Sequence, residues 1–131
     1  ALAESPRVKT WAQGSAATSA LASRYVGGAD AAAGVATARR LLEERSIRSS
    51  LYYLGEYVNT PALVDENVTA KLEVAELLGR AGLDVHVSVD PTQVGHSIDV
   101  DLARRSVLAI GEAIAAAAGC RPGFHALMLD M

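Results

Sequence analysis

The sequence has a single cysteine, few aromatic side chains and no long apolar run. Cys120 is the only cysteine among 131 residues, which excludes an internal disulfide and fits a reducing compartment. We therefore expect a cytoplasmic protein. No apolar stretch approaches the roughly 20 residues that a bilayer-spanning helix needs, so we expect no integral membrane segment. The first residues have neither the basic nor the apolar region of a secretory signal, and we expect none.

The chain also lacks an excess of positive charge. Its formal net charge is −3, and its basic residues are scattered, so we expect no binding to nucleic acid or to an anionic membrane. Hydrophobic residues make up 50% of the chain but aromatic residues only 5%. This composition favours helices packed on an aliphatic sheet over an all-β fold.

Hydrophobic periodicity predicts two helices, followed by three strands that alternate with two more helices. Asp30 and Thr60 are suited to cap the helices that follow them, and Pro61 is suited to a first helical position. The predicted helices cover residues 6–24, 31–45, 61 to 79 or 82, and 101–118, and the predicted strands cover 49–54, 84–89 and 124–131.

This order predicts an α/β fold in which a parallel βαβαβ unit is preceded by two helices, like the first part of a (β/α)8 TIM barrel. A three-stranded doubly wound sheet is the alternative. We divide the chain into an N-terminal helical segment, 1–28, and a partial barrel with its first three strands, 29–131. Residues 124–131 are nearly all apolar, which predicts a strand buried on both faces. We therefore expect further strands after Met131 in the functional protein.

Polar residues follow each predicted strand. Glu56 comes after the first strand, Asp90 to Gln93 after the second, and Asp130 after the third. Since the carboxyl ends of parallel strands meet at one rim, we expect these side chains to gather at a catalytic site. Asp130 ends an apolar strand, where a buried carboxylate would need a partner.

Three motifs resemble the proline dehydrogenase family of FAD-dependent (β/α) barrels. They are Leu51-Tyr-Tyr-Leu-Gly-Glu56, Val87-Ser-Val-Asp-Pro-Thr-Gln-Val-Gly95 and Leu127-Met-Leu-Asp-Met131. The resemblance runs from about Tyr25 to the last residue. It implies a flavoprotein oxidoreductase of proline catabolism, which oxidises proline or a related cyclic amine or amino acid with FAD as hydride acceptor.

The resemblance also implies roles for individual residues. Glu56 matches a catalytic-site carboxylate that holds a substrate-binding arginine. Asp130 matches an aspartate beside the flavin and the substrate. Thr92 and Gln93 fall in a loop that lines the floor of the cofactor site.

Two positions in the predicted substrate site depart from the family pattern. The family usually has a lysine, which helps to bind the proline carboxylate, where this chain has Asp90, and commonly an aspartate where it has Tyr52. Exchanging a cation for an anion turns an attraction into a repulsion, each about 4 kcal/mol at ~4 Å and an effective dielectric of ~20. Either the substrate differs from proline or the activity has been lost. Tyr52 and Tyr53 should point to opposite faces of their strand.

Three further expectations complete the analysis. The family's flavin- and substrate-binding arginines lie on later elements, so the 131 residues alone should neither bind FAD nor catalyse the reaction. Glu56, Asp90 and Asp130 are alternatively suited to hold Mg²⁺ or Mn²⁺ at the barrel mouth. A non-catalytic barrel remnant that acts through protein contacts is the other alternative. Its exposed strand edge would then favour a homo-oligomer.

Overall fold

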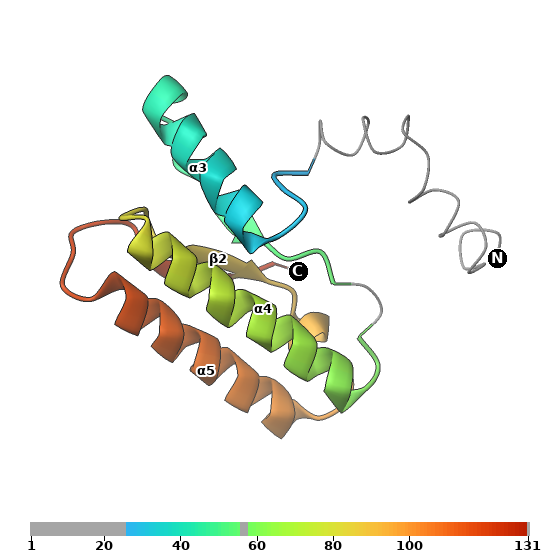
Figure 1. The fold of residues 1–131 in the computed structure, drawn as a ribbon. Coiled ribbons are helices and arrows are strands. Elements are labelled where there is room, and N and C mark those ends of the chain that lie inside the picture. The colour runs from blue at the N-terminus through green and yellow to red at the C-terminus, as the bar shows by residue number, and fades with distance from the viewer. Residues whose placement is uncertain (1–25, 56–57, 131) are drawn as a thin grey trace, which may run out of the picture.

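The computed structural model describes residues 26–55 and 58–130, which form an α/β fold with three helices and a three-stranded parallel sheet (Figure 1). The elements are helix α3 (Ala31–Arg45), strand β1 (Leu51–Tyr52), helix α4 (Pro61–Arg80), strand β2 (His86–Val89), the 3-10 turn η1 (Pro91–Val94), helix α5 (Val100–Ala118) and strand β3 (Ala126–Leu129). The predicted class and the βαβαβ order are confirmed for this part. The helix expected at 6–24 lies outside the described residues.

The helix ends follow from local chemistry that the sequence predicted correctly. The side chain of Asp30 accepts a hydrogen bond from the Ala33 amide, 2.8 Å away, and Thr60 caps α4 through the Leu63 amide. Pro61 is the first residue of α4, where its missing N–H costs no hydrogen bond. Gly119 ends α5 with a φ of 56°, a left-handed value that suits glycine.

The strands lie in the sheet in chain order, β1-β2-β3, and both pairs are parallel. In register, Val87 lies between Leu51 and Leu127, and Ser88 lies between Tyr52 and Met128. The paired strands are shorter than the predicted ones. The first was expected over 49–54, yet only two of its residues pair with β2.

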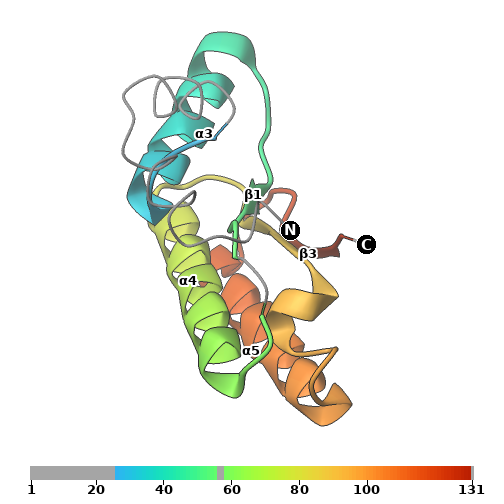
Figure 2. The same cartoon turned by 90° about the vertical axis from the view of Figure 1, so that its right-hand side faces the viewer.

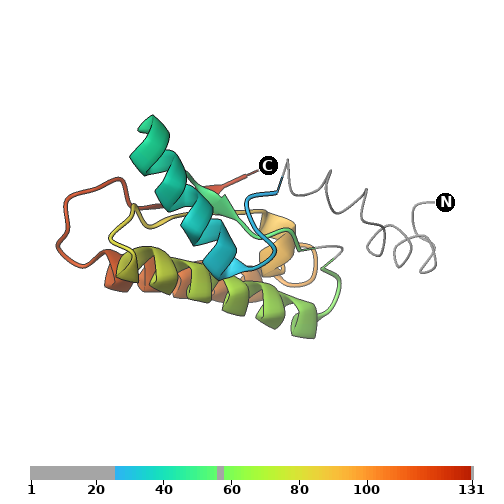
Figure 3. The ribbon, with the colours of Figure 1, turned by 45° about the horizontal axis from the view of Figure 1, so that its top comes forward.

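One face of the sheet is covered by helices. Figure 3 shows α4 and α5 side by side beneath the sheet. Val87 and Val89 of β2 point towards them and, together with Val85 just before the strand, are buried in one core with side chains from all three helices. Gly79 lets α4 and α5 approach closely, because a Cβ there would lie 2.7 Å from the Ala117 carbonyl oxygen.

The opposite face of the sheet is open in the part of the chain that the structure describes (Figure 2). The exposed side chains of Tyr52 and Met128 lie on this face, because strand residues alternate between faces and neither belongs to the helix-covered core. The prediction that the last strand is buried on both faces is wrong for these residues. Met128 is 43% and Leu129 54% exposed, because β3 has a neighbour on one side only.

None of the helices among residues 26–55 and 58–130 has the length and apolar character to cross a bilayer.

Candidate functional site

Three of the predicted site residues gather at the carboxyl end of the sheet. Tyr52 ends β1, while Asp90 and Asp130 directly follow β2 and β3. Burial is the largest cause that raises the pKa of Tyr52, and the negative charges of Asp90 and Asp130 raise it further. The carboxylates that follow two different strands are therefore close enough to Tyr52 to influence the ionisation of its phenol. Glu56, which was predicted at the same rim, lies outside the described residues.

The open face next to these carboxylates carries two buried polar atoms without a partner. Ser88 lies between Tyr52 and Met128 in register and is only 3% exposed, yet its Oγ has no hydrogen bond within the described chain. The same is true of Nδ1 of His86, one step earlier along β2, whose ring stacks on Phe124 at 5.0 Å. Unsatisfied buried polar groups are rare in folded proteins and call for an explanation.

Asp90 also has a structural role within its turn. Its Oδ1 accepts hydrogen bonds from the amide and the hydroxyl of Thr92, at 2.7 and 2.6 Å, and so caps η1. Asp90 thus begins a turn in the way expected of an Asp-Pro sequence. The hydroxyl of Thr92 therefore donates its hydrogen within this turn, to the Asp90 carboxylate.

Gln93 joins the two loops that follow β1 and β2. Its Nε2 donates to the carbonyl oxygens of Tyr53, 2.9 Å away, and Gly55, 3.2 Å away. Its Oε1 accepts from Nζ of Lys71 at 2.9 Å. Gln93 is 2% exposed and both atoms of its amide are hydrogen-bonded, so it holds the loop after β1, its own loop and α4 together. Contact between Gln93 or Thr92 and a cofactor stays a prediction.

Lys71 is the residue of this region that the sequence analysis missed. It projects from α4, is fully buried, and lies 5.4 Å from the centre of the Tyr53 ring. Burial lowers the pKa of Lys71 to about 8, while attraction to the Asp90 carboxylate opposes that shift. Its spacing from the buried Val64, Asn67 and Leu78 is the signal that was available.

The loop after β1 lies against α4 at Gly55. A Cβ at this position would lie 1.9 Å from Oδ1 of Asn67, so a larger residue would require the Asn67 side chain to move. Asn67 is itself buried, and its Nδ2 donates to the Leu63 carbonyl at 2.9 Å. This contact places the residue before Glu56 beside the helix that carries Lys71.

Asp130 lies at the exposed end of β3. Its amide donates to the Val89 carbonyl at 2.9 Å, which holds the backbone against β2, and its side chain is exposed. The argument that a buried carboxylate would need a partner is therefore wrong for Asp130. Its position beside Asp90 and Tyr52 is what remains in favour of a functional role.

A cavity of about 690 Å³ lies on the helix side of β1, behind Tyr53. Its size is within the range of small-molecule sites. Apolar atoms of Leu51, Val74 and Ala70 contribute to its wall, and the carboxylate of Asp30 at its edge already caps α3. The cavity is thus a second place where a small ligand could bind, and a test of the rim must tell the two apart.

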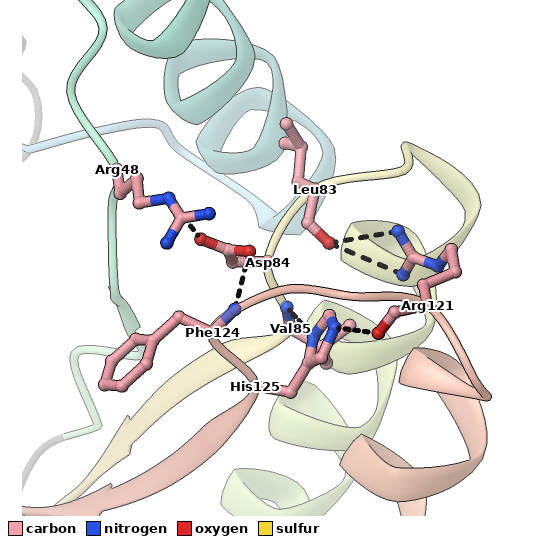
Figure 4. A network of polar contacts seen from close by, with 7 residues as sticks. All are labelled: Arg48, Leu83, Asp84, Val85, Arg121, Phe124 and His125. Carbon is pink, nitrogen blue, oxygen red and sulfur yellow. Dashed lines mark hydrogen bonds and ion pairs between the residues drawn. The ribbon is translucent and has the colours of Figure 1, made fainter.

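The amino end of the sheet has a different polar network (Figure 4). Asp84 forms an ion pair with Arg48 at 3.1 Å and accepts a hydrogen bond from the Phe124 amide at 3.0 Å. Nδ1 of His125 accepts from the Val85 amide at 3.0 Å, so Nε2 carries the proton that points to the Arg121 carbonyl oxygen, 3.2 Å away.

A metal site is a weaker alternative. Among residues 26–55 and 58–130, no three His, Cys, Asp or Glu side chains are grouped closely enough to hold a metal ion. The predicted Mg²⁺ or Mn²⁺ site needs Glu56 in addition to Asp90 and Asp130, so it stays a prediction.

Comparison with known proteins adds no relative: no family model, no curated protein and no solved structure matches the chain.

Proposed function

We propose that the chain is the first part of a flavin-dependent oxidoreductase that oxidises a cyclic amine or amino acid, as the resemblance to the proline dehydrogenase family implies. The observation that carries this proposal is the grouping of Tyr52, Asp90 and Asp130 beside an open sheet face with an unpartnered Ser88. Sites of parallel α/β folds lie at this end of the strands.

The open face fits a planar, polar cofactor in two respects. Ser88 Oγ and His86 Nδ1 supply buried hydrogen-bonding atoms that the described chain leaves without partners. Tyr52 and Met128 supply exposed apolar surface on either side of Ser88. A bound flavin would supply the hydride acceptor, and the protein would supply orientation and electrostatics.

The chain's own residues would bind and orient the amine. Oxidation requires a proton to leave the ammonium nitrogen, a hydride to leave the neighbouring carbon for the flavin, and a C=N bond to form in a protonated imine. Asp130 and Asp90 present negative charge where both the ammonium substrate and the iminium product are positive. Gln93 and Lys71 hold the loops that carry these groups. The role of Glu56 as the partner of a substrate-binding arginine is carried by the resemblance alone.

A non-catalytic role through protein contacts is the second candidate. The observation in its favour is the free edge of β3, where Met128 and Leu129 are exposed and no strand pairs within the described chain. Another subunit, including a second copy, would cover such an edge. A cytoplasmic location remains part of the proposal.

Native mass spectrometry of the protein purified from cells that produce it separates these candidates. A chain heavier than 13.6 kDa that carries flavin, and whose flavin is bleached anaerobically by a cyclic amine, is the expected result. A flavin-free chain of 13.6 kDa would rule out the oxidoreductase. The number of copies in that spectrum then tests the protein-contact role directly.

A further inference from the structure

The carboxyl end of the sheet presents negative charge to the open face, and no described cation balances it there. Asp90 and Asp130 follow β2 and β3, and the negative charges of both raise the pKa of the Tyr52 phenol. Lys71 attracts Asp90, but it is fully buried, and its Nζ is held by Gln93 on the helix side beside Tyr53. Arg48 and Arg121 lie at the other end of the strands (Figure 4).

Ser88 provides the independent sign of a ligand. Its Oγ is buried on the same face, directly between the exposed side chains of Tyr52 and Met128, and it has no partner in the described chain. Asp90 and Asp130 lie two residues beyond Ser88 and Met128 and so point to the same side of the sheet. We call Tyr52, Ser88, Met128, Asp90 and Asp130 the row. They supply an aromatic ring, a hydroxyl acceptor, an apolar thioether and two carboxylates.

The charges of Asp90 and Asp130 determine which ligands this surface can bind. An ammonium group is attracted by both carboxylates, donates to a hydroxyl or carboxylate oxygen, and interacts favourably with the face of an aromatic ring. A carboxylate on the same ligand would meet two like charges without a cation to receive it. An amino acid is therefore a poor ligand for this row, whereas a simple amine fits.

We propose that the open face of the sheet binds a cationic cyclic amine that lacks a carboxylate, with Asp90 and Asp130 as its counter-ions. The amine site gives the substrate class of the proposed oxidation. Oxidation of the amine rests on the proposed function, whereas binding of the amine does not. Asp90 is then a specificity-determining residue, since it stands where a carboxylate-binding site would need positive charge, and Tyr52 contributes its aromatic ring to the same site.

Binding to the purified chain tests this with three probes that share a saturated five-membered ring. Pyrrolidine is cationic at pH 7, proline adds a carboxylate, and tetrahydrofuran removes the charge. We expect pyrrolidine to shift the amide resonances of Ser88, Asp90 and Asp130 in a ¹⁵N–¹H spectrum, and to bind on the order of tenfold more tightly than either of the others. Equal or tighter binding of proline, or no binding of pyrrolidine, would overturn the proposal.

Variants show whether the ligand is at the row. Asp130→Asn should weaken pyrrolidine binding several-fold, and Asp90→Lys should reverse the preference towards proline. Glu112→Gln, which removes an exposed carboxylate on α5, is the matched control and should change nothing. Ala70→Phe narrows the cavity behind Tyr53 and should also leave binding intact. Loss of binding in Ala70→Phe alone would place the ligand in the cavity and overturn the proposal.

The far-ultraviolet circular dichroism of each variant must match that of the wild type. If Asp90→Lys does not fold, Asp90→Asn replaces it and should weaken pyrrolidine binding without favouring proline. If the protein purified from cells that produce it is a flavin-free chain of 13.6 kDa and still binds pyrrolidine, the result supports this inference and counts against the oxidoreductase. A flavoprotein that prefers proline supports the oxidoreductase and overturns this inference.

Discussion

The two ends of the sheet differ in how their polar groups are used. At the amino end, Asp84 and His125 contact the backbone or a side chain of a neighbouring segment through hydrogen bonds of about 3 Å or an ion pair (Figure 4). At the carboxyl end, Ser88 has no partner, and Asp130 extends from the strand into solvent. The network around Asp84 and His125 therefore stabilises the fold, while Ser88 and the Asp130 side chain keep hydrogen-bonding capacity for a ligand.

Lys71 is the exception at the carboxyl end, because its buried charge costs stability. Its pKa of about 8 lies below the unfolded value of 10.5, so the unfolded chain binds more protons between these pH values. The free energy of unfolding should therefore rise as pH increases from 8 to 10.5, by about 3 kcal/mol at most. Urea unfolding at a series of pH values measures the rise, and Lys71→Met should lack it. Parallel curves for the two proteins would contradict the burial of a charged amine.

Asp84→Ala should break the network at the amino end. It removes the ion pair with Arg48 and the acceptor of the Phe124 amide, which should lower the free energy of unfolding by about 2 kcal/mol. Urea denaturation gives the value. Asp130→Ala is the matched carboxylate at the other end and should stay within about 0.5 kcal/mol of the wild type. Equal losses in both variants would remove the distinction between the two ends.

His125→Leu should have a smaller effect. It leaves the Val85 amide without an acceptor in a partly buried position, at a cost of about 1–2 kcal/mol. His125→Asn offers an oxygen near the position of Nδ1 and should recover part of that loss. Thermal unfolding compares the two, and an asparagine variant no more stable than the leucine variant would mean that this hydrogen bond does not matter.

Asp130→Asn should lower the pKa of Tyr52 without changing stability. The carboxylate is one of two that raise this pKa, so its removal makes the phenolate easier to form. The ¹³Cζ resonance of Tyr52 followed against pH reports the shift. Glu112→Gln should leave the titration unchanged, and the same titration in Asp130→Asn as in the wild type would separate Asp130 from Tyr52.

Local sequence was enough to predict the elements of the described chain. Asp30, Thr60 and Pro61 predicted helix starts correctly because capping depends on residues three or four positions apart. The strands were predicted to be longer than their paired segments, because the extent of pairing depends on the neighbouring strand. The position of Asp90 and Asp130 at one end of the sheet followed from the parallel order of the strands, and Tyr52 joins them as the last residue of β1.

Contacts between distant segments could not be predicted in this way. Lys71 was assigned to no face, because a lysine on a helix usually extends into solvent, and only Gln93, 22 residues later, explains its burial. The ion pair of Arg48 with Asp84 joins segments 36 residues apart, and no local sequence pattern around either residue predicts the other as its partner. Asp130 was expected to be buried because its neighbours are apolar, but burial requires a covering element.

The chain order of the strands in the sheet has a consequence for synthesis on the ribosome. When β2 emerges, β1 and α4 already exist, and when β3 emerges, β2 is already available as its partner. Within the described chain, β1 pairs once β2 has been made, and each later strand then finds its partner already present, so each new βα unit can add to the preceding one. Helix α4 and strand β2 should therefore acquire protection from amide hydrogen exchange before β3 does, so that the described sheet grows from β1 towards β3.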